Sequence, residues 1–217
     1  MTTTLILVPT AFELKILQGA LDAAIDVASV RLECCGFGAI ASAARAVQLA
    51  AVYDPQRIIL AGIAGGISED LQIGQACWFT EVGAYGIGAG SGNQFRTAHE
   101  MGWPHIAAAD SSSKYSIGDR IQLSTPKGSP QPNGGLLLTV CSASADQHDV
   151  DLRLDKFPEA VAEDMEGFSV AVAGELCGVP VEIVRGISNT AGDRNKENWR
   201  ITDALMAASE LMLESLI

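Results

Sequence analysis

Residues 157–193, FPEAVAEDMEGFSVAVAGELCGVPVEIVRGISNTAGD, determine the fold expected for this chain. A short apolar run at 160–162 ends in an acidic cluster, and from Glu166 onward apolar residues recur at three- and four-residue spacing, which predicts a helix. Gly178 supplies a left-handed end to this helix, and the proline two residues later prevents its continuation. Residues 181–187 are rich in β-branched side chains and nearly continuous, as expected of a parallel strand covered on both faces. The stretch therefore predicts a strand, a helix and a second strand.

Two polar side chains follow the two predicted strands of this stretch. Glu166 leaves the end of the first strand, and Asn189 leaves the end of the second, in a polar turn at 188–192. In an open α/β sheet, ligands bind outside the carboxyl ends of the strands. A βαβ crossover is right-handed and places its two strands in one sheet. We therefore expect the carboxylate and the amide to face one cleft.

The remaining sequence repeats the same two kinds of pattern, without an internal repeat or a linker, so we expect one α/β domain over residues 1–217. Loops rich in glycine, proline or polar residues are expected at 85–93, 111–116, 124–135 and 193–198. Further strands are expected at 4–8, 30–35, 57–61, 75–83, 119–123 and 136–140, and further helices after residues 9–11 (with Phe12, Ile16, Leu17 and Leu21 on one face), at 39–53, 95–104 and 146–156, and at the end of the chain.

The composition is that of an α/β enzyme. The chain has 217 residues, of which 48% are hydrophobic and only 6% aromatic, with 22 glycines. Its formal net charge of −12 argues against nucleic acid as a partner, since phosphate binding needs a basic face. No apolar run approaches the roughly 18 residues of a membrane span, and the first nine residues suit a strand better than a signal peptide. We therefore expect a cytoplasmic protein that does not contact membranes.

The cysteines and histidines give no metal-binding pattern. The five cysteines stand in apolar surroundings without a Cys-x-x-Cys pair, so we expect buried, reduced thiols, as in the cytoplasm. The three histidines fit no zinc spacing, and surface positions are expected for them. The sequence therefore predicts neither a metal nor a cofactor. The cysteines are Cys34, Cys35, Cys77, Cys141 and Cys177, and the histidines are His99, His105 and His148.

Three further features stand beside predicted strand ends, and each has two interpretations. Glu13 lies in a first helical turn, where it is either a surface acid that complements the helix dipole or a functional carboxylate. The Gly-x-Gly at 36–38 allows backbone amides to approach an anion or an ordered water. The glycines at 62–66, Gly65 among them, suit either close approach of the backbone to a ligand or a tight turn.

Three phrases in order, AGIAGG at 61–66, DMEG at 164–167 and VRGISN at 184–189, resemble the purine-nucleoside phosphorylase and nucleosidase superfamily across nearly the whole chain. SNTAGDR at 188–194, with Trp199 shortly after it, and the stretch 95–104 resemble the futalosine hydrolase branch, a group of menaquinone-pathway nucleosidases. The resemblance implies a mixed, distorted central β-sheet flanked by helices, and a homo-oligomer.

The resemblance also implies roles for particular residues. Glu166 would bind the ribose hydroxyls, with Met165 against the sugar, while Glu13 would polarise the attacking water. Asn189 would read the five-membered-ring edge of the purine. The proton for the leaving purine would come from solvent or from Asp193.

Two departures from the superfamily pattern suggest the reaction. Adenosine-type nucleosidases carry aspartate where this chain has Asn189, and an amide offers both a donor and an acceptor to a six-oxo purine. Bacterial-type phosphorylases carry a phosphate-binding arginine where this chain has Leu60, so water is favoured as the nucleophile unless Arg45 or Arg57 substitutes.

The sequence thus favours hydrolysis of a small-molecule nucleoside, futalosine, with release of hypoxanthine. The distal carboxylate of futalosine needs a local cation, for which Arg194 and Arg96 are the candidates. The alternatives are a methylthioadenosine/S-adenosylhomocysteine nucleosidase, a purine nucleoside phosphorylase, and a non-catalytic nucleoside-binding protein.

Overall fold

The computed structural model of this chain describes residues 3–21, 29–108, 116–126 and 134–216. The two predicted loops at 111–116 and 124–135 lie mostly outside these residues. The elements in chain order are β1 (Thr4–Val8), α1 (Ala11–Leu21), β2 (Val30–Cys34), α2 (Gly38–Tyr53), β3 (Arg57–Gly66), β4 (Ala76–Phe79), β5 (Glu81–Tyr85), β6 (Gly88–Ala89), β7 (Arg96–Thr97), β8 (Arg120–Gln122), β9 (Leu136–Val140), α3 (Gln147–Leu154), β10 (Ala160–Asp164), α4 (Gly167–Cys177), β11 (Val181–Thr190) and α5 (Ile201–Leu216), with short 3₁₀ turns at Gly92–Gln94 and Lys196–Asn198.

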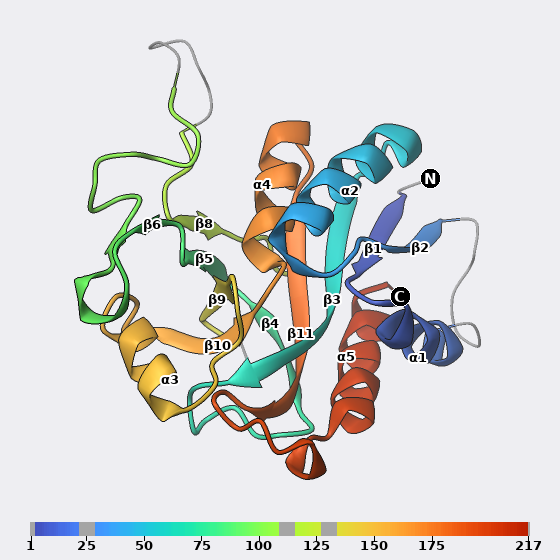
Figure 1. Cartoon of the computed structure of the whole chain (residues 1–217). Helices are drawn as coiled ribbons and strands as arrows, with labels where there is room; N and C mark the ends of the chain where they lie inside the picture. The colour runs from blue at the N-terminus through green and yellow to red at the C-terminus, as the bar shows by residue number, and fades with distance from the viewer. Residues whose placement is uncertain (1–2, 22–28, 109–115, 127–133, 217) are drawn as a thin grey trace.

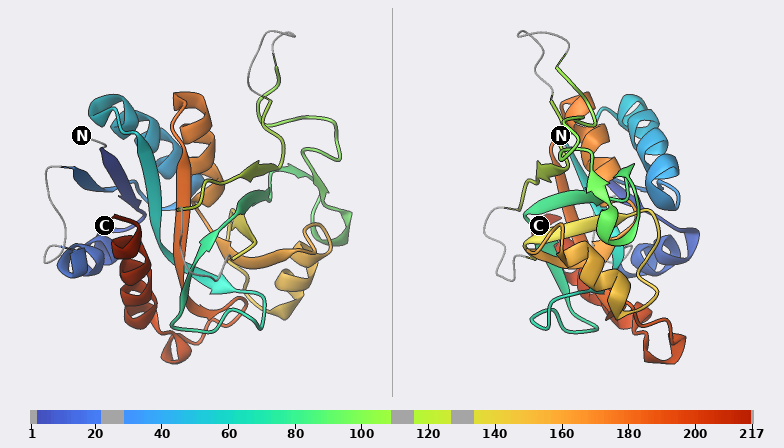
Figure 2. Two further views of the ribbon diagram at one scale, coloured as in Figure 1. Left: turned by 180° about the vertical axis from the view of Figure 1, so that it is seen from behind. Right: turned by 60° about the vertical axis from the view of Figure 1, so that its left-hand side comes forward.

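A mixed central sheet flanked by helices organises the described residues, which confirms the predicted fold class (Figure 1). The strand order is β2-β1-β3-β10-β9-β5-β8. β11 also pairs with β3, along most of its length, and β4 pairs with β11. β1 and β11 run parallel to β3, whereas β10 is antiparallel to it. Figure 2 shows β3 and β11 side by side through the centre of the molecule.

Alternating side chains of the central strands serve two separate cores, because successive residues of a strand point to opposite faces of the sheet. Leu5 and Leu7 of β1 belong to the core that includes α2 and α4. Ile6 and Val8 belong to the core that includes α1 and α5. Both faces of the sheet are therefore covered, as the near-continuous apolar character of these strands indicates.

The opening stretch forms the predicted strand, helix and strand, with two differences. Gly178 ends α4 in the left-handed conformation (φ 68°), as expected. β11 is longer than predicted and runs to Thr190, so that Asn189 lies inside the strand, at a register shift against β3. β10 and β11 also do not form a parallel βαβ unit, because β10 is antiparallel to β3 while β11 is parallel to it.

Three other predicted elements are wrong in detail. The strand expected at 75–83 is two strands, because β4 pairs with β11 while β5 pairs with β9, and the chain changes partner at Thr80. The helix expected at 95–104 is instead β7, paired with β6, followed by turns. The glycines expected just after the third strand lie within β3, which extends to Gly66.

Several side chains differ in burial from the prediction. Phe12, expected on the buried face of α1, is 59% exposed. Cys35 and Cys77 are buried, but Cys141 and Cys177 are exposed, so the expectation of uniformly buried thiols is wrong. Burial raises the pKa of the Cys35 thiol to about 12, and the thiol of Cys77 is affected in the same way. These two thiols are therefore poor nucleophiles at neutral pH.

Candidate active site

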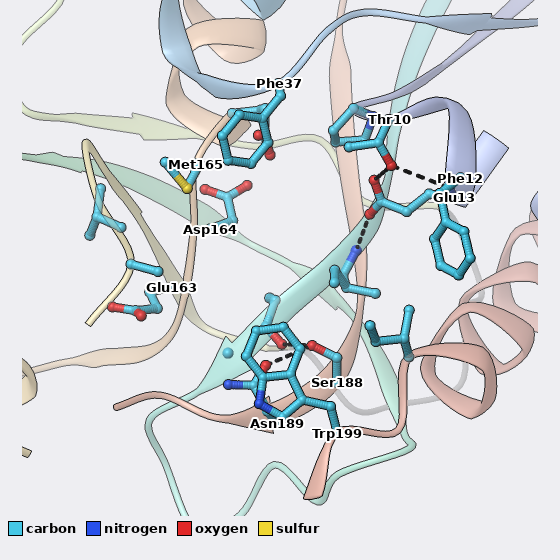
Figure 3. Close-up of a pocket in the computed structure, with 18 of the residues that line it drawn as sticks. Thr10, Phe12, Glu13, Phe37, Glu163, Asp164, Met165, Ser188, Asn189 and Trp199 are labelled. Carbon is cyan, nitrogen blue, oxygen red and sulfur yellow. Dashed lines mark hydrogen bonds between the residues drawn. The ribbon is translucent and has the colours of Figure 1, made fainter. Parts of the chain in front are cut away.

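A cavity of about 340 Å³ opens at the carboxyl ends of β1, β3, β9, β10 and β11 (Figure 3). Six of the eight residues predicted to act on the substrate line this cavity: Glu13, Gly65, Met165, Glu166, Asn189 and Arg194. The cleft that we expected Glu166 and Asn189 to share is thus confirmed. The strands reach it by a different topology from the predicted one, since the long β3 lies between β10 and β11.

Glu166 stands at the N-cap position of α4, where its side chain makes no capping hydrogen bond, and it is buried in the cavity lining. The backbone N–H of Gly38 donates to its Oε1 at 2.9 Å, and Nη2 of Arg185 donates to its Oε2 at 3.2 Å. The anion expected at the Gly-x-Gly turn is therefore the chain's own Glu166. Burial raises the pKa of Glu166 to about 7, with the Asp164 carboxylate adding to the rise and the Arg185 guanidinium opposing it. This carboxyl group is thus poised to change its charge near neutral pH.

Arg185 of β11 is a part of this site that the sequence interpretation missed. Its side chain is fully buried, and Nη2 also donates to Oδ2 of Asp164 at 2.5 Å. Asp164 in turn accepts from the hydroxyl of Thr139 at 2.6 Å and from the N–H of Gly167 at 2.8 Å. A charged residue in the middle of a buried strand was the signal, since an arginine is almost never fully buried without a partner.

Glu13 is buried, so the interpretation as a surface acid is wrong. The hydroxyl of Thr10 donates to its Oε2 at 2.5 Å, and the N–H of Ile63 donates to its Oε1 at 3.0 Å. A Cβ atom on Gly62 would lie 2.4 Å from Nη1 of Arg185 and 2.8 Å from Oε1 of Glu13. Gly62 is therefore the glycine at which side chains approach the backbone closely. Its lack of a side chain leaves room for Glu13 and Arg185 on the same side of β3.

Asn189 is nearly buried, and most of its hydrogen-bonding capacity is used within the chain. Its Oδ1 accepts from the hydroxyl of Ser188 at 2.8 Å, and its Nδ2 donates to the carbonyl of Thr190 at 2.8 Å and, more weakly, to that of Asp193 at 3.5 Å. An amide oxygen has two lone pairs, so Oδ1 retains one for a ligand. In this arrangement the amide offers an acceptor to the cavity, while its donor is held by the backbone.

Asp193 and Arg96 do not lie in the cavity lining. The carboxylate of Asp193 accepts from the N–H of Asn195 and from Nδ2 of Asn198, both at 2.8 Å. The hydrogen bond from Asn198 also lowers the pKa of Asp193, which makes this group a poor proton donor. Arg96 donates to the carbonyl of Glu100 at 2.7 Å.

Position 60, Arg57 and Arg45 were the positions considered for a phosphate-binding cation. In the described structure, none of the three places a cation in the cavity lining. Leu60 is fully buried in the apolar core. Arg57 donates to Thr4 and pairs with Glu182, and it is absent from the cavity lining. Arg45, the other alternative, donates to Gln48 on an exposed face of α2. This arrangement favours water over phosphate as the nucleophile.

Within the described part of the chain, no group of three or more metal-ligating side chains gathers, and no helix is both long and apolar enough to cross a membrane. The candidate groups for the chemistry are the carboxyl groups and the amide that line the cavity, with Arg185 paired to Glu166. Two buried carboxyl groups around a strand-end cavity suit an enzyme that cleaves a glycosidic bond, in which one acid activates water and the other stabilises a cationic sugar.

The chain belongs to the phosphorylase superfamily, which matches residues 14–216. A futalosine hydrolase from Streptomyces coelicolor is 29% identical over 156 residues, which are 70% of this chain and 62% of that protein, less than two thirds of its length. A 5′-methylthioadenosine/S-adenosylhomocysteine nucleosidase from Chromohalobacter salexigens is 26% identical over 84% of this chain and 76% of its own length. Both relatives are named as nucleosidases, the enzyme class that the sequence predicts.

Solved structures give the same fold at lower sequence identity. A 5′-methylthioadenosine/S-adenosylhomocysteine nucleosidase from Colwellia psychrerythraea, in complex with adenine, has a TM-score of 0.77 at 18% identity, over 99% of this chain and 94% of that chain. The corresponding enzyme from S. pneumoniae, in complex with a transition-state inhibitor, has a TM-score of 0.78 at 20% identity, over 99% of this chain and 98% of that chain. At such identities the likeness establishes the architecture.

Proposed function

We propose that this protein hydrolyses the N-glycosidic bond of futalosine and releases hypoxanthine, a step in menaquinone biosynthesis. The observation that carries the proposal is the presence of an amide, Asn189, in the same cavity as the buried acids Glu13 and Glu166. The similarity to a futalosine hydrolase supports futalosine as the substrate. The apolar residue Leu60, at the position where phosphorylases carry a phosphate-binding arginine, supports water as the nucleophile.

The proposed mechanism assigns one task to each of the three polar groups. The ionised Glu166 accepts hydrogen bonds from the ribose hydroxyls and stabilises the positive charge that the sugar acquires near the transition state. Glu13 orients a water molecule and removes its proton as the bond to the base breaks, a contribution of about a hundredfold to ten-thousandfold for general base catalysis. The departing purine takes up a proton at N7 from solvent, and Oδ1 of Asn189 uses its remaining lone pair to accept from the resulting N7–H.

Recognition of the six-oxo group by Asn189 requires one rearrangement. Its Nδ2 must exchange the carbonyl of Thr190 for the substrate oxygen. Adenine presents an amino group at that position, which would leave two donors facing each other. A site that leaves a buried polar group unpaired can reject a substrate by about ten-thousandfold. Discrimination by base is therefore part of the proposal.

Methylthioadenosine or S-adenosylhomocysteine is the second candidate substrate class. It is favoured by the Chromohalobacter salexigens relative, which matches a larger share of both chains than the futalosine hydrolase does. Asn189 argues against it, because its Nδ2 donor would face the amino group of adenine.

The proposal is tested by incubating the purified protein separately with futalosine, inosine and methylthioadenosine, with and without phosphate, and measuring the free base. We expect hypoxanthine from futalosine at a rate that phosphate does not change. Adenine as the main product would establish the second candidate. Strict dependence on phosphate would establish a phosphorylase, and binding of futalosine without any release of base would favour a non-catalytic binding protein.

The pH dependence of the reaction follows from Glu166. Because burial raises its pKa to about 7, the carboxyl group is neutral below this pH and ionised above it. Only the ionised form stabilises a cationic sugar, so kcat/KM for futalosine should rise tenfold per pH unit below about pH 7 and then level off. A pH–rate profile of the protein checks this. A profile that is flat from pH 5 to pH 8 would contradict the assigned role.

Replacement of Asn189 with aspartate should shift substrate preference toward six-amino purines. The acid accepts a hydrogen bond from an amino group and can protonate the base, so the ratio of kcat/KM for methylthioadenosine to that for futalosine should rise about tenfold or more. Steady-state kinetics on both substrates measure the ratio, with Asn195→Asp in the loop after β11 as a control that adds the same charge outside the cavity lining. An unchanged ratio in Asn189→Asp would refute the role given to this amide.

A further inference from the structure

Glu163 of β10 is a further buried acid of the cavity lining, and the proposed mechanism gives it no task. Figure 3 shows its carboxylate on the side of the cavity away from Glu13. Both of its oxygens are engaged within the chain. Oε1 accepts from the N–H of Ser144 at 2.8 Å, and Oε2 accepts from the hydroxyl of the same residue at 2.6 Å. Because Ser144 is fully buried, these hydrogen bonds orient a segment of the chain and not an exposed side chain.

Arg153 of α3 holds the same segment from a second side. Its Nε lies 3.3 Å from Oε2 of Glu163, in an ion pair whose two side chains are each 5% exposed. Nη2 donates to the carbonyl of Ser142 at 2.7 Å, and the guanidinium lies 5.4 Å from the centre of the Tyr85 ring. We call this ion pair the Glu163–Arg153 clamp. It holds residues 142–144 through a carbonyl, an N–H and a hydroxyl.

The clamped segment forms part of the cavity wall and packs on the turn after β11. Ala143 lines the cavity. A Cβ atom on Gly192 would lie 2.8 Å from the carbonyl carbon and oxygen of Asp146, so the two segments touch through their backbones. Gly192 has a φ of 85°, in the left-handed region that favours glycine. A shift of residues 142–146 would therefore displace this turn.

The same turn holds the amide of Asn189. Nδ2 donates to the carbonyl of Thr190 and approaches that of Asp193, two residues that lie on either side of Gly192. Misplacement of a binding group by about 1 Å can lower a rate by about a hundredfold, even when the cause lies away from the chemistry. The position of the clamped segment thus influences the end of the cavity at which the purine is expected.

We propose that Glu163 is a positioning residue that fixes the base-binding end of the cavity. Through Ser144 it holds residues 142–146 against the turn next to Asn189. Arg153 is its charge partner, and Glu163 itself makes no contact with the reacting atoms. The inference rests on the proposed function in one respect, the assignment of Asn189 to the purine, and it does not depend on which purine is released.

The test separates the hydrogen bonds of Glu163 from its charge. Glu163→Gln keeps the length of the side chain and an oxygen that can accept from Ser144, whereas Glu163→Met keeps the length but has no such acceptor. Both variants leave Arg153 without its charge partner, so both should unfold at lower urea concentration than the native protein. Adding Arg153→Met to either variant should recover part of this stability.

Affinity for the free base should follow the hydrogen bonds instead. It is measured by calorimetry with hypoxanthine and with adenine, and the base that the native protein binds more tightly is followed in the variants. Glu163→Met should weaken binding about tenfold, roughly the effect of one hydrogen bond, and adding Arg153→Met should not restore it. Glu163→Gln should remain within about twofold of the native protein.

A serine variant tests the same contact with the ion pair intact. Ser144→Ala removes the hydroxyl that donates to Glu163 and should weaken base binding about threefold to tenfold. Its control is Ser209→Ala. Ser209 is a buried serine of α5 whose hydroxyl donates to the carbonyl of Met206, outside the cavity lining, and its replacement should leave base affinity unchanged.

Equal losses of base affinity in Glu163→Gln and Glu163→Met, or recovery of base affinity on adding Arg153→Met, would make Glu163 a structural charge partner and overturn the proposal. Native affinity in Ser144→Ala, or an equal loss in Ser209→Ala, would also overturn it, and the serine variants decide the outcome if those of Glu163 do not fold. Failure of the proposed function has a different signature. The native protein would then release adenine and no hypoxanthine, while the variants keep the expected order of affinities.

Discussion

Replacing Glu166 with glutamine should give a folded protein whose kcat/KM for futalosine is lower by about a hundredfold to a thousandfold, the usual effect of removing one transition-state-stabilising group. The amide is nearly isosteric and can still accept from the N–H of Gly38, so the contact of residue 166 with the start of α2 should persist. It carries no negative charge, however, and cannot stabilise a cationic sugar. The rise of kcat/KM with pH below about pH 7 should disappear in the same variant, because its titrating group is gone.

The matched control for this experiment is Glu182→Gln. Glu182 is a buried carboxylate of β11 that pairs with Arg57 at 3.4 Å and does not line the cavity. Its replacement should leave kcat/KM within about twofold of the native value. Circular dichroism and urea unfolding report whether each variant is folded. A folded Glu166→Gln variant with native activity would remove this residue from the mechanism, and a misfolded one would make it a structural residue.

Replacing Arg185 with methionine should produce the largest loss of stability. Arg185 is fully buried and is the cation that Asp164 and Glu166 share. Removing one partner of a buried ion pair leaves uncompensated charge, at a cost of about 3–5 kcal/mol in the free energy of unfolding. Activity should fall as well, because the pKa of Glu166 rises further when its opposing guanidinium is lost, and more of this residue is then neutral at pH 7.

Urea unfolding measures the stability loss, with Arg120→Met as the control. Arg120 also contacts two carboxylates, Glu81 and Glu159, but its side chain is 36% exposed, so its removal should cost no more than about 1 kcal/mol. Adding Asp164→Asn to Arg185→Met should recover part of the lost stability by removing the stranded charge. An Arg185→Met variant as stable as Arg120→Met would show that the buried network contributes little.

Local sequence signals predicted the elements around the site well. The end of α4 at Gly178 follows from the conformational freedom of glycine, and the apolar runs of β1, β3 and β11 follow from their burial on both faces. The common cavity of Glu166 and Asn189 was expected from the position of each residue at a strand end.

The errors come from contacts between segments distant in sequence. The reversal of β10 relative to β3 and the change of strand partner at Thr80 depend on which strands meet, and no local pattern encodes this. The hydrogen bonds that occupy Asp193 lie within one loop, yet they depend on side-chain geometry that spacing alone does not reveal.

The burial of Arg185 was within reach of the sequence, since it is a charge within a strand predicted to be covered on both faces. Its two partners were not, because they depend on how β10 and β11 approach β3. Lys196, which also lines the cavity, was overlooked for a different reason, as a lysine in a charged loop is most often a solvated surface residue.

The central claim is that acids and an amide in one cavity hydrolyse a six-oxo purine nucleoside in preference to a six-amino one. A competition experiment tests it most directly. Equimolar futalosine and methylthioadenosine are mixed with the protein in phosphate-free buffer, and the two free bases are measured at low conversion, so that their ratio equals the ratio of the two kcat/KM values. The account predicts hypoxanthine in at least a hundredfold excess over adenine. Adenine equal to or above hypoxanthine would contradict it.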